Sequence, residues 1–333
     1  MKRILIGLNL CLILFIPAVL VSGCSRSSGG ETGKDLTLTF RENQPFKIAQ
    51  FTDIHWKNDD KEACAHTVSI IRYVLETEQP DFVVLTGDIV TNTSESGWKE
   101  LMPVFTGAGV KFAVTLGNHD DEAEWSRTQI FDYLETLPGF VGEKGPDDIT
   151  GTGNYIIPVA SADKETTVAN LWFFDSNAYC QDTSISHYGW IHFNQISWYR
   201  EKSREITSGN GGIPIPALAF FHIPLPEYNE VINQPGTIGE YQEEVCSPKI
   251  NSGMFTAFYE MQDVKGTFVG HDHVNNYIGI HKGIALAYGQ STGGYGDLEK
   301  GARIIELREN EPGFRTWVRT MGGALLHFSY NMN

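Results

Sequence analysis

The sequence predicts an α/β domain, because short apolar runs alternate with segments of helical periodicity along most of its length. From Leu36 onward the sequence has no internal repeat, low-complexity run or long linker, which favours a single domain. The roughly 300 residues of this part, in a chain that is 41% hydrophobic, are enough to form one large core.

The first half of the domain is expected to contain three buried strands separated by two helices. Residues 46–51, 82–86 and 112–116 are apolar runs of strand length. Between them, residues 67–78 and 98–105 carry apolar side chains at helical spacing.

The second half is expected to continue the same alternation. The helical spacing of residues 194–206 predicts one further helix among the strands. The expected strands are residues 154–159, 171–175, 217–221, 267–269 and 284–288, followed by a closing hairpin of residues 302–307 and 314–319.

The N-terminus resembles the signal of a bacterial lipoprotein. Two basic residues, Lys2 and Arg3, precede an apolar stretch at residues 4–20, and Val-Ser-Gly-Cys at residues 21–24 resembles a lipobox. The apolar stretch is short and ends in small residues, which favours export and cleavage over a transmembrane helix. We therefore expect residues 1–23 to be a lipoprotein signal peptide.

Cleavage at this site would make Cys24 the lipid-modified first residue of the mature protein. Residues 24–40 are expected to hold the lipid and a flexible tether rich in Ser and Gly, and residues 41–333 the folded domain. Because Ser25 rather than Asp follows the cysteine, the resemblance implies an exported lipoprotein anchored in the outer membrane, facing the periplasm or the cell surface.

The charge balance disfavours polyanionic partners. The chain has 25 Lys and Arg against 41 Asp and Glu, a net charge of −16, and such a surface repels nucleic acid. Attraction for a phosphate group must therefore come from local metal charge. The cysteines of the expected domain, Cys64, Cys180 and Cys246, lack metal-binding spacing; one disulfide is an option, and buried free thiols are the default expectation.

Five short clusters rich in Asp, His and Asn each follow a predicted strand. They are Asp53-Ile54-His55, Gly87-Asp88, Gly117-Asn118-His119-Asp120, His222, and Gly270-His271-Asp272-His273. Open α/β sheets gather ligands outside the carboxyl ends of their strands, so these distant clusters are expected to converge at one rim. A single Asp or His in such a place is usually a turn, cap or core residue, but the ordered set favours a metal site.

The order of these clusters, D-x-H, G-D, G-N-H-[DE], H and G-H-x-H, resembles the calcineurin-like metallophosphoesterase superfamily. The resemblance extends from Asp53 to His273. It implies a four-layer α/β/β/α sandwich, in which two mixed β-sheets are flanked by helices and a two-metal site lies at the carboxyl ends of the strands. Residues 117–121 and 172–176 further resemble the single-domain relatives of purple acid phosphatases.

The resemblance also implies the ligand set. Asp88 matches the carboxylate that bridges two metal ions, between which a bridging hydroxide serves as the nucleophile. The first ion would be completed by Asp53, His55 and His273. The second would be completed by Asn118, His222 and His271. Because oxygen and imidazole ligands without thiolate suit Zn, Mn or Fe, the expected cofactors are two divalent or trivalent ions of these metals.

His119 is the remaining candidate for chemistry. The family places this histidine near the leaving-group oxygen, as a general acid or a phosphate-orienting donor, and a histidine titrates in the useful pH range. Asn118 is expected to bind metal and also to touch a phosphate oxygen. The residue that orients His119 remains open between Asp120 and Asp121.

The pattern departs from two branches of the family three residues after Asp88. Purple acid phosphatases have a metal-binding Tyr there, and Ser/Thr protein phosphatases have an Asp followed by Arg, whereas this sequence has Thr91 and Asn92. The purple Fe(III)–phenolate colour is therefore not expected, and the protein-phosphatase branch is disfavoured. Tyr295, in a glycine-rich turn, is expected near the active-site rim. The other histidines, expected to be surface or core groups, are His66, His187, His192, His281 and His327.

These observations predict metal-dependent hydrolysis of small phosphate esters, with phosphomonoesters favoured. The first alternative is a phosphodiesterase or nucleotide-sugar hydrolase that uses the same site. The second is a non-catalytic, metal-containing surface binding protein, against which the intact His119 speaks.

Overall fold

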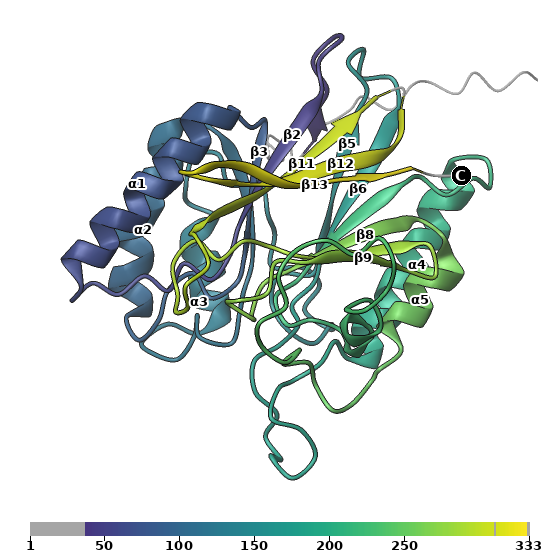
Figure 1. Cartoon of the computed structure of the whole chain (residues 1–333). Coiled ribbons are helices and arrows are strands. Elements are labelled where there is room, and N and C mark those ends of the chain that lie inside the picture. The colour runs from purple at the N-terminus through teal and green to yellow at the C-terminus, as the bar shows by residue number, and fades with distance from the viewer. Residues whose placement is uncertain (1–36, 310, 332–333) are drawn as a thin grey trace, which may run out of the picture. The chain divides into compact units, whose positions relative to one another are not determined.

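The strands of the protein form two mixed β-sheets that pack face to face between two layers of helices (Figure 1). The computed structural model describes residues 37–309 and 311–331. The predicted signal peptide, Cys24 and most of the predicted tether therefore lie outside the described residues. Within the described part, the expected four-layer α/β/β/α sandwich is confirmed.

The first sheet has the strand order β13-β12-β11-β2-β3-β4. Its strands are β2 (Phe46–Phe51), β3 (Phe82–Thr86), β4 (Lys111–Thr115), β11 (Gly301–Arg308), β12 (Glu311–Thr320) and β13 (Gly323–Tyr330). Because β2, β3 and β4 are parallel, their carboxyl ends lie at the same edge. The antiparallel β11 and β12 form the expected closing hairpin, and β13 extends it by a further strand.

Three helices cover the outer side of this sheet (Figure 1). They are α1 (Lys61–Glu78), α2 (Ser94–Ala108) and α3 (Arg127–Leu134). The first begins earlier than its apolar periodicity predicts, because the side chain of Asp60 caps it by accepting a hydrogen bond from the Ala63 N–H. These helices place the loops after β2, β3 and β4 at one end of the sheet.

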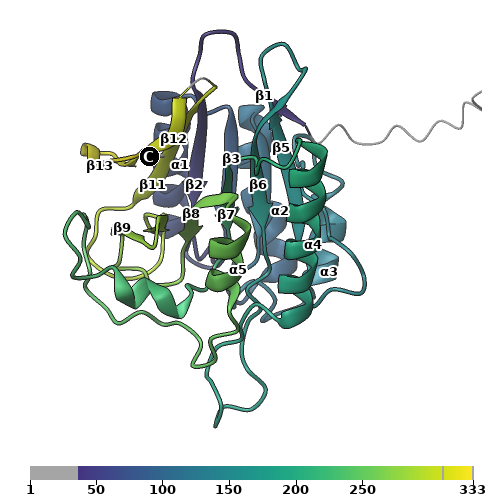
Figure 2. The ribbon, with the colours of Figure 1, turned by 90° about the vertical axis from the view of Figure 1, so that its right-hand side faces the viewer.

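The second sheet has the strand order β1-β5-β6-β7-β8-β10-β9. Its strands are β1 (Leu38–Thr39), β5 (Tyr155–Ala160), β6 (Thr167–Phe173), β7 (Ala217–Phe220), β8 (Val264–Val269), β9 (Ile278–His281) and β10 (Ile284–Tyr288). The central strands β6, β7, β8 and β10 are parallel. Helices α4 (Phe193–Gly209) and α5 (Met254–Met261) lie over its outer face, in front of the strands in Figure 2, and a short 3₁₀ helix, η1 (Pro226–Glu230), precedes α5.

Strand β6 shows why the central strands are apolar on both faces. Leu171 and Phe173 belong to the core between the sheets, whereas Trp172 and the following Phe174 belong to the core beneath α4 and α5. Trp172 meets Tyr199 of α4 edge-to-face, with the ring centroids 4.9 Å apart. Successive side chains of a strand point to opposite faces, so a strand buried on both faces has no polar alternation.

No helix within the described residues is long and apolar enough to cross a bilayer. Cys64 is buried, as expected, but Cys180 and Cys246 are half-buried, and all three are free thiols. The expectation of buried thiols is therefore wrong for the last two, which lie in the long loops between α-helices and strands rather than in a core.

Candidate metal centre

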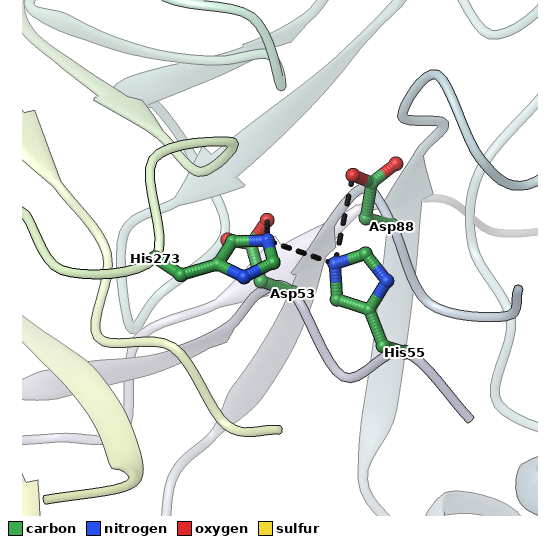
Figure 3. A group of neighbouring side chains, drawn as sticks. All are labelled: Asp53, His55, Asp88 and His273. Atoms are coloured by element: carbon green, nitrogen blue, oxygen red, sulfur yellow. Dashed lines mark hydrogen bonds and ion pairs between the residues drawn. The ribbon is translucent and has the colours of Figure 1, made fainter. Parts of the chain in front are cut away.

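Four predicted ligands converge where the carboxyl ends of β2, β3 and β8 meet (Figure 3). The Nε2 atoms of His55 and His273 face each other at 2.9 Å. His273 Nε2 lies 3.4 Å from Asp53 Oδ1, and His55 Nε2 lies 3.7 Å from Asp88 Oδ2. One ligand atom from each of the four residues can be chosen so that all lie within 4.8 Å of one another, which is the spacing of a metal shell.

A second group shares Asp88 with the first. His222 Nε2 lies 3.1 Å from Asp88 Oδ2, and His271 Nδ1 lies 3.2 Å from His222 Nε2. Both histidines follow strands of the other sheet, β7 and β8, so the two groups lie on the seam between the sheets. Since Asp88 is the one residue common to the two groups within the described part of the chain, it occupies the position required of a bridge.

Asn118, which the motif assigns to the second ion, has a buried side-chain oxygen that is free to bind a cation. Its side chain is buried, and its Nδ2 donates to the Tyr179 hydroxyl at 2.9 Å. Its Oδ1 is buried without a hydrogen-bond partner among the described residues. An unpaired buried carbonyl oxygen costs free energy unless a ligand satisfies it, and a cation does so.

The protonation preferences of the histidines also fit a cation. Burial lowers the pKa of His271 to about 3 and that of His55 to about 4, so both imidazoles are neutral at pH 7, as metal ligation requires. Burial also opposes the charged form of His222, but the Asp88 carboxylate outweighs it and raises the pKa of His222 to about 9. The Asp88 carboxylate thus favours a positive charge at His222, and a metal bound at Nε2 would take the place of that proton.

The backbone of the ligand loops is strained. Asp53, His55, Asp88 and His271 have positive φ values of 50°, 49°, 50° and 81°. Left-handed backbone at residues with a Cβ costs roughly 1–3 kcal/mol each and clusters at functional sites, where the surroundings enforce it. Four of the twelve non-glycine residues with positive φ in the described part of the chain are predicted ligands.

Glycines next to the ligands permit close approaches that no other residue allows. A Cβ on Gly87, which has φ +85°, would lie 2.4 Å from His222 Nδ1. A Cβ on Gly117 would lie 2.2 Å from Asp88 Oδ1. The glycines of the G-D and G-N-H-D motifs are therefore required by the packing of one ligand loop against the next.

Hydrogen bonds fix the direction of the ligand rings. His222 Nδ1 donates to the Thr86 carbonyl at 2.8 Å, which leaves Nε2 for a metal. His55 Nδ1 lies 2.7 Å from Thr91 Oγ1 and is oriented in the same way. Thr91 stands where other branches of the family have Tyr or Asp, and the sequence did not predict its contact with a proposed ligand.

The side chain that orients His119 is neither of the two expected candidates, Asp120 and Asp121. Glu122 Oε2 accepts a hydrogen bond from His119 Nδ1 at 2.7 Å. Asp120 instead accepts from the N–H groups of Gly117, Ile89 and Val90 and joins two ligand loops. Asp121 lies 3.5 Å from the Arg127 guanidinium. Both expected candidates are therefore wrong; the spacing from His119 to Glu122, one turn of chain, is the signal that could have identified it.

A cavity of about 660 Å³ opens beside the first group of ligands. His55, His119 and His273 line it together with Trp56, Lys300 and Tyr295. The Tyr295 ring lies 4.1 Å from the His273 ring, so its expected place at the rim is confirmed. His66 also lines the cavity, although the sequence suggested only a surface or core role. The cavity offers room for an organic group attached to a phosphate.

Comparisons with known proteins agree with this geometry. Residues 46–275 match the model of the family described as calcineurin-like phosphoesterase. "Probable inactive purple acid phosphatase 29" of Arabidopsis thaliana is 32% identical over 321 residues, which cover 86% of this chain and 82% of that protein. "Phosphatase DCR2" of Saccharomyces cerevisiae is 32% identical, and the match covers 86% of this chain and 55% of that protein.

Solved structures show a similar fold at low identity. A dimetal phosphatase from Danio rerio has a TM-score of 0.61 at 12% identity, with 87% of this chain and 100% of that chain covered. A purple acid phosphatase from yellow lupin has a TM-score of 0.51 at 12% identity, with 86% of this chain and 53% of that chain covered. At these identities the similarity concerns the fold.

Proposed function

Because the chain belongs to the calcineurin-like phosphoesterase family, we propose that it hydrolyses phosphate esters, and phosphomonoesters in particular, at a two-metal centre. The observation that carries this proposal is the position of Asp88. Its carboxylate is shared by both ligand groups, and its Oδ1 accepts a hydrogen bond from the His119 N–H at 2.9 Å. The shared carboxylate thereby also holds the backbone of the loop that carries His119.

The proposed ligands divide between the two ions as the motifs imply. Asp53, His55 and His273 would hold the first ion and Asn118, His222 and His271 the second, with Asp88 common to both. Zn, Mn or Fe suit these oxygen and imidazole donors. When bound, two such ions lower the pKa of a coordinated water and neutralise charge that builds up on the phosphoryl oxygens.

His119 is proposed to protonate the leaving group. Its Nδ1 donates to Glu122, so Nε2 is the nitrogen left to exchange a proton with the substrate. As oxygen from water bonds to phosphorus, the bond from phosphorus to the ester oxygen breaks, and the proton from Nε2 converts the departing alkoxide to an alcohol. The His119 side chain is 33% exposed and lines the cavity, so it is accessible to a substrate.

The cavity supports a small substrate. Its walls mix Trp56 and Ile54 with the ammonium of Lys300, which donates to the Tyr295 carbonyl at 2.7 Å. An organic alcohol of modest size fits such walls, and Lys300 contributes local positive charge in an otherwise acidic protein. The similarity to "Phosphatase DCR2" and to the probable inactive purple acid phosphatase supports a monoester over a diester.

One specific observation favours the non-catalytic alternative: the Arabidopsis relatives carry the words "probable inactive" in their names. The test is metal analysis of the purified full-length protein, followed by assays of a phosphomonoester and a phosphodiester side by side after loading with Zn, Mn or Fe. We expect two metal equivalents and faster turnover of the monoester. Faster diester turnover would refute the monoesterase assignment, and no turnover with either ester would favour a binding protein.

The same assay needs a control for contaminating phosphatases. Asp88→Asn, purified identically, should lose the activity, because this substitution removes the carboxylate shared by both ligand groups. Activity that persists unchanged in the variant would come from another protein or from another site.

A further inference from the structure

Hydrogen bonds connect the proposed acid His119 to the proposed ligand Asn118 by a route outside the motifs. Asn118 Nδ2 donates to the Tyr179 hydroxyl at 2.9 Å, and that hydroxyl donates to Glu122 Oε1 at 3.1 Å. Glu122 Oε2 accepts from His119 Nδ1 at 2.7 Å. Since Asn118 and His119 are neighbours in the chain, these contacts close a ring that includes the peptide between them.

Of the acidic residues in its loop, Glu122 is the one whose carboxylate joins the hydrogen bonds between Tyr179 and His119. Asp120 is occupied by three backbone N–H groups, and Asp121 lies beside Arg127. Glu124 accepts from the Ser94 hydroxyl and from the Glu95 N–H. Glu122 alone among these four acidic residues contacts His119, so the loop separates structural carboxylates from one that faces the site.

Tyr179 reaches the ring from the other sheet. It lies in the long loop between β6 and α4, whereas Asn118 and Glu122 follow β4. The same loop carries Tyr188, whose ring packs edge-on against the His271 ring at 4.4 Å. The loop thus contacts the second ligand group at two points.

We propose that Glu122 and Tyr179 are positioning residues of the hydrolytic reaction. Glu122 holds His119 with Nε2 directed at the leaving group, and Tyr179 holds the Asn118 amide with Oδ1 directed at the second ion. The inference rests on the proposed function, because it assigns a role within that reaction. Neither residue is placed in contact with the reacting atoms.

The two roles predict different defects. Loss of Glu122 should impair the acid step, so the effect should depend on how much the leaving group needs a proton. Loss of the Tyr179 hydroxyl should free the Asn118 amide to rotate, so the effect should appear in the affinity for the second metal equivalent. Partners that orient a metal ligand are typically worth 10–100-fold in metal affinity.

The first experiment compares Glu122→Gln with Glu124→Gln in the full-length, metal-loaded protein. Glu124→Gln is a matched control, because it makes the same chemical change two residues away in the same loop without touching His119. We expect Glu122→Gln to lose on the order of 10-fold or more in kcat with an alkyl phosphate and little with nitrophenyl phosphate, whose phenolate leaves without a proton. In a His119→Ala background, Glu122→Gln should cause no further loss.

Equal losses of Glu122→Gln for the two esters, or a further loss in the His119→Ala background, would overturn the positioning role while leaving the phosphoesterase proposal intact. A wild-type protein that hydrolyses neither ester would instead remove the proposed function. A second readout needs no turnover: NMR spectra of the His119 imidazole should show an Nδ1–H in a strong hydrogen bond in the wild type and in Glu124→Gln. In Glu122→Gln this Nδ1–H signal should move to the position of a weaker hydrogen bond, and an unchanged spectrum would overturn the role of Glu122.

The second experiment tests Tyr179→Phe, which removes one hydroxyl from a side chain that is 41% exposed and is expected to fold normally. Titration with Zn should show the first equivalent bound as in the wild type and the second bound about 10-fold more weakly. Wild-type affinity for both equivalents would show that Tyr179 does not position Asn118.

Discussion

Replacing Gly117 by Ala tests how tightly the ligand loops pack around Asp88. The added Cβ would lie 2.2 Å from Asp88 Oδ1 and 2.3 Å from the Asp88 N atom, whereas ordinary contacts begin at 3.4 Å. The φ of Gly117 is outside the left-handed range, so alanine is compatible with its backbone and the effect is steric. One of the two loops must therefore move by roughly 1 Å.

A shift of that size is large for a catalytic site. Ligand geometry has to hold within about 0.5 Å, and a misplacement of about 1 Å costs on the order of 10²-fold in rate. We expect Gly117→Ala to lose at least that much turnover and to retain fewer than two metal equivalents, because the displaced carboxylate serves both ligand groups. Metal analysis and turnover measured on the same preparation provide the assay.

Gly107→Ala is the matched control. Gly107 lies in α2, and a Cβ there would meet nothing within 4 Å. The control should keep full activity and gain roughly 0.5–1 kcal/mol in the free energy of unfolding, because alanine is the better helix former. A Gly117→Ala protein with two metal equivalents and unchanged turnover would refute the steric reasoning.

The remaining predictions concern single groups. Asp88→Asn should weaken both metal sites, whereas His271→Ala should primarily empty the second; two full equivalents in Asp88→Asn would contradict the bridge. His119→Ala should keep both metals and lose roughly 10²–10⁴-fold with an alkyl phosphate but little with nitrophenyl phosphate, and equal losses would rule out the acid role. Burial would raise the pKa of Glu78, but hydrogen bonds from Trp317 and Arg319 outweigh it and hold the pKa below its ordinary value. The carboxylate should therefore stabilise the fold at pH 7 by about 1–3 kcal/mol relative to Glu78→Gln. This difference in the free energy of unfolding should shrink as the pH falls below about 4.5 and through the lower pKa of the folded state. A difference that does not depend on pH would refute the stabilising role of the carboxylate. Cys24→Ser should block incorporation of labelled fatty acid, and continued labelling would disprove the lipid anchor.

The elements that were predictable from the sequence are those buried on both faces or amphipathic over several turns. Strands β2, β3 and β4 match the expected apolar runs closely, because helices cover one face of their sheet and the second sheet covers the other. Helices α3 and α5 have eight residues each, too few for a periodic pattern to stand out. Strand β13 was not predicted, because its side chains are largely exposed or half-exposed and the segment carries little hydrophobic signal.

The candidate site was predictable where its residues lie in short motifs and not where they act through space. Asp88 and His271 stand next to glycines at strand ends, and that local pattern is visible in the sequence. Tyr179 contacts Asn118 across 61 residues, and no spacing rule links them. Thr91 and Glu122 lie close to motifs, but their roles depend on ring directions that only the folded loops determine.

The division of ligands between the sheets makes the site dependent on the seam that joins them. The loops after β2, β3 and β4 of one sheet carry Asp53, Asp88 and Asn118, whereas the loops after β7 and β8 of the other carry His222, His271 and His273. Each proposed ion therefore takes ligands from both sheets. Buried Gln50 crosses this seam, because its Nε2 contacts Thr86 Oγ1 at 2.9 Å in its own sheet and the Val269 carbonyl at 3.0 Å in the other.

Buried polar contacts favour one alignment of the packed layers over others. In Gln50 the Nε2 group provides these contacts, whereas Oε1 is buried without a hydrogen-bond partner among the described residues. The Thr86 carbonyl accepts from His222 Nδ1 at 2.8 Å, and the His222 carbonyl accepts from the Gly270 N–H at 3.1 Å. The alignment of the sheets and the directions of the ligands are therefore set by one continuous group of hydrogen bonds. The proposed ligands with positive φ follow the strands of these sheets, and they are Asp53, His55, Asp88 and His271. Their backbone strain persists because the packing of two large apolar cores holds the sheets in place.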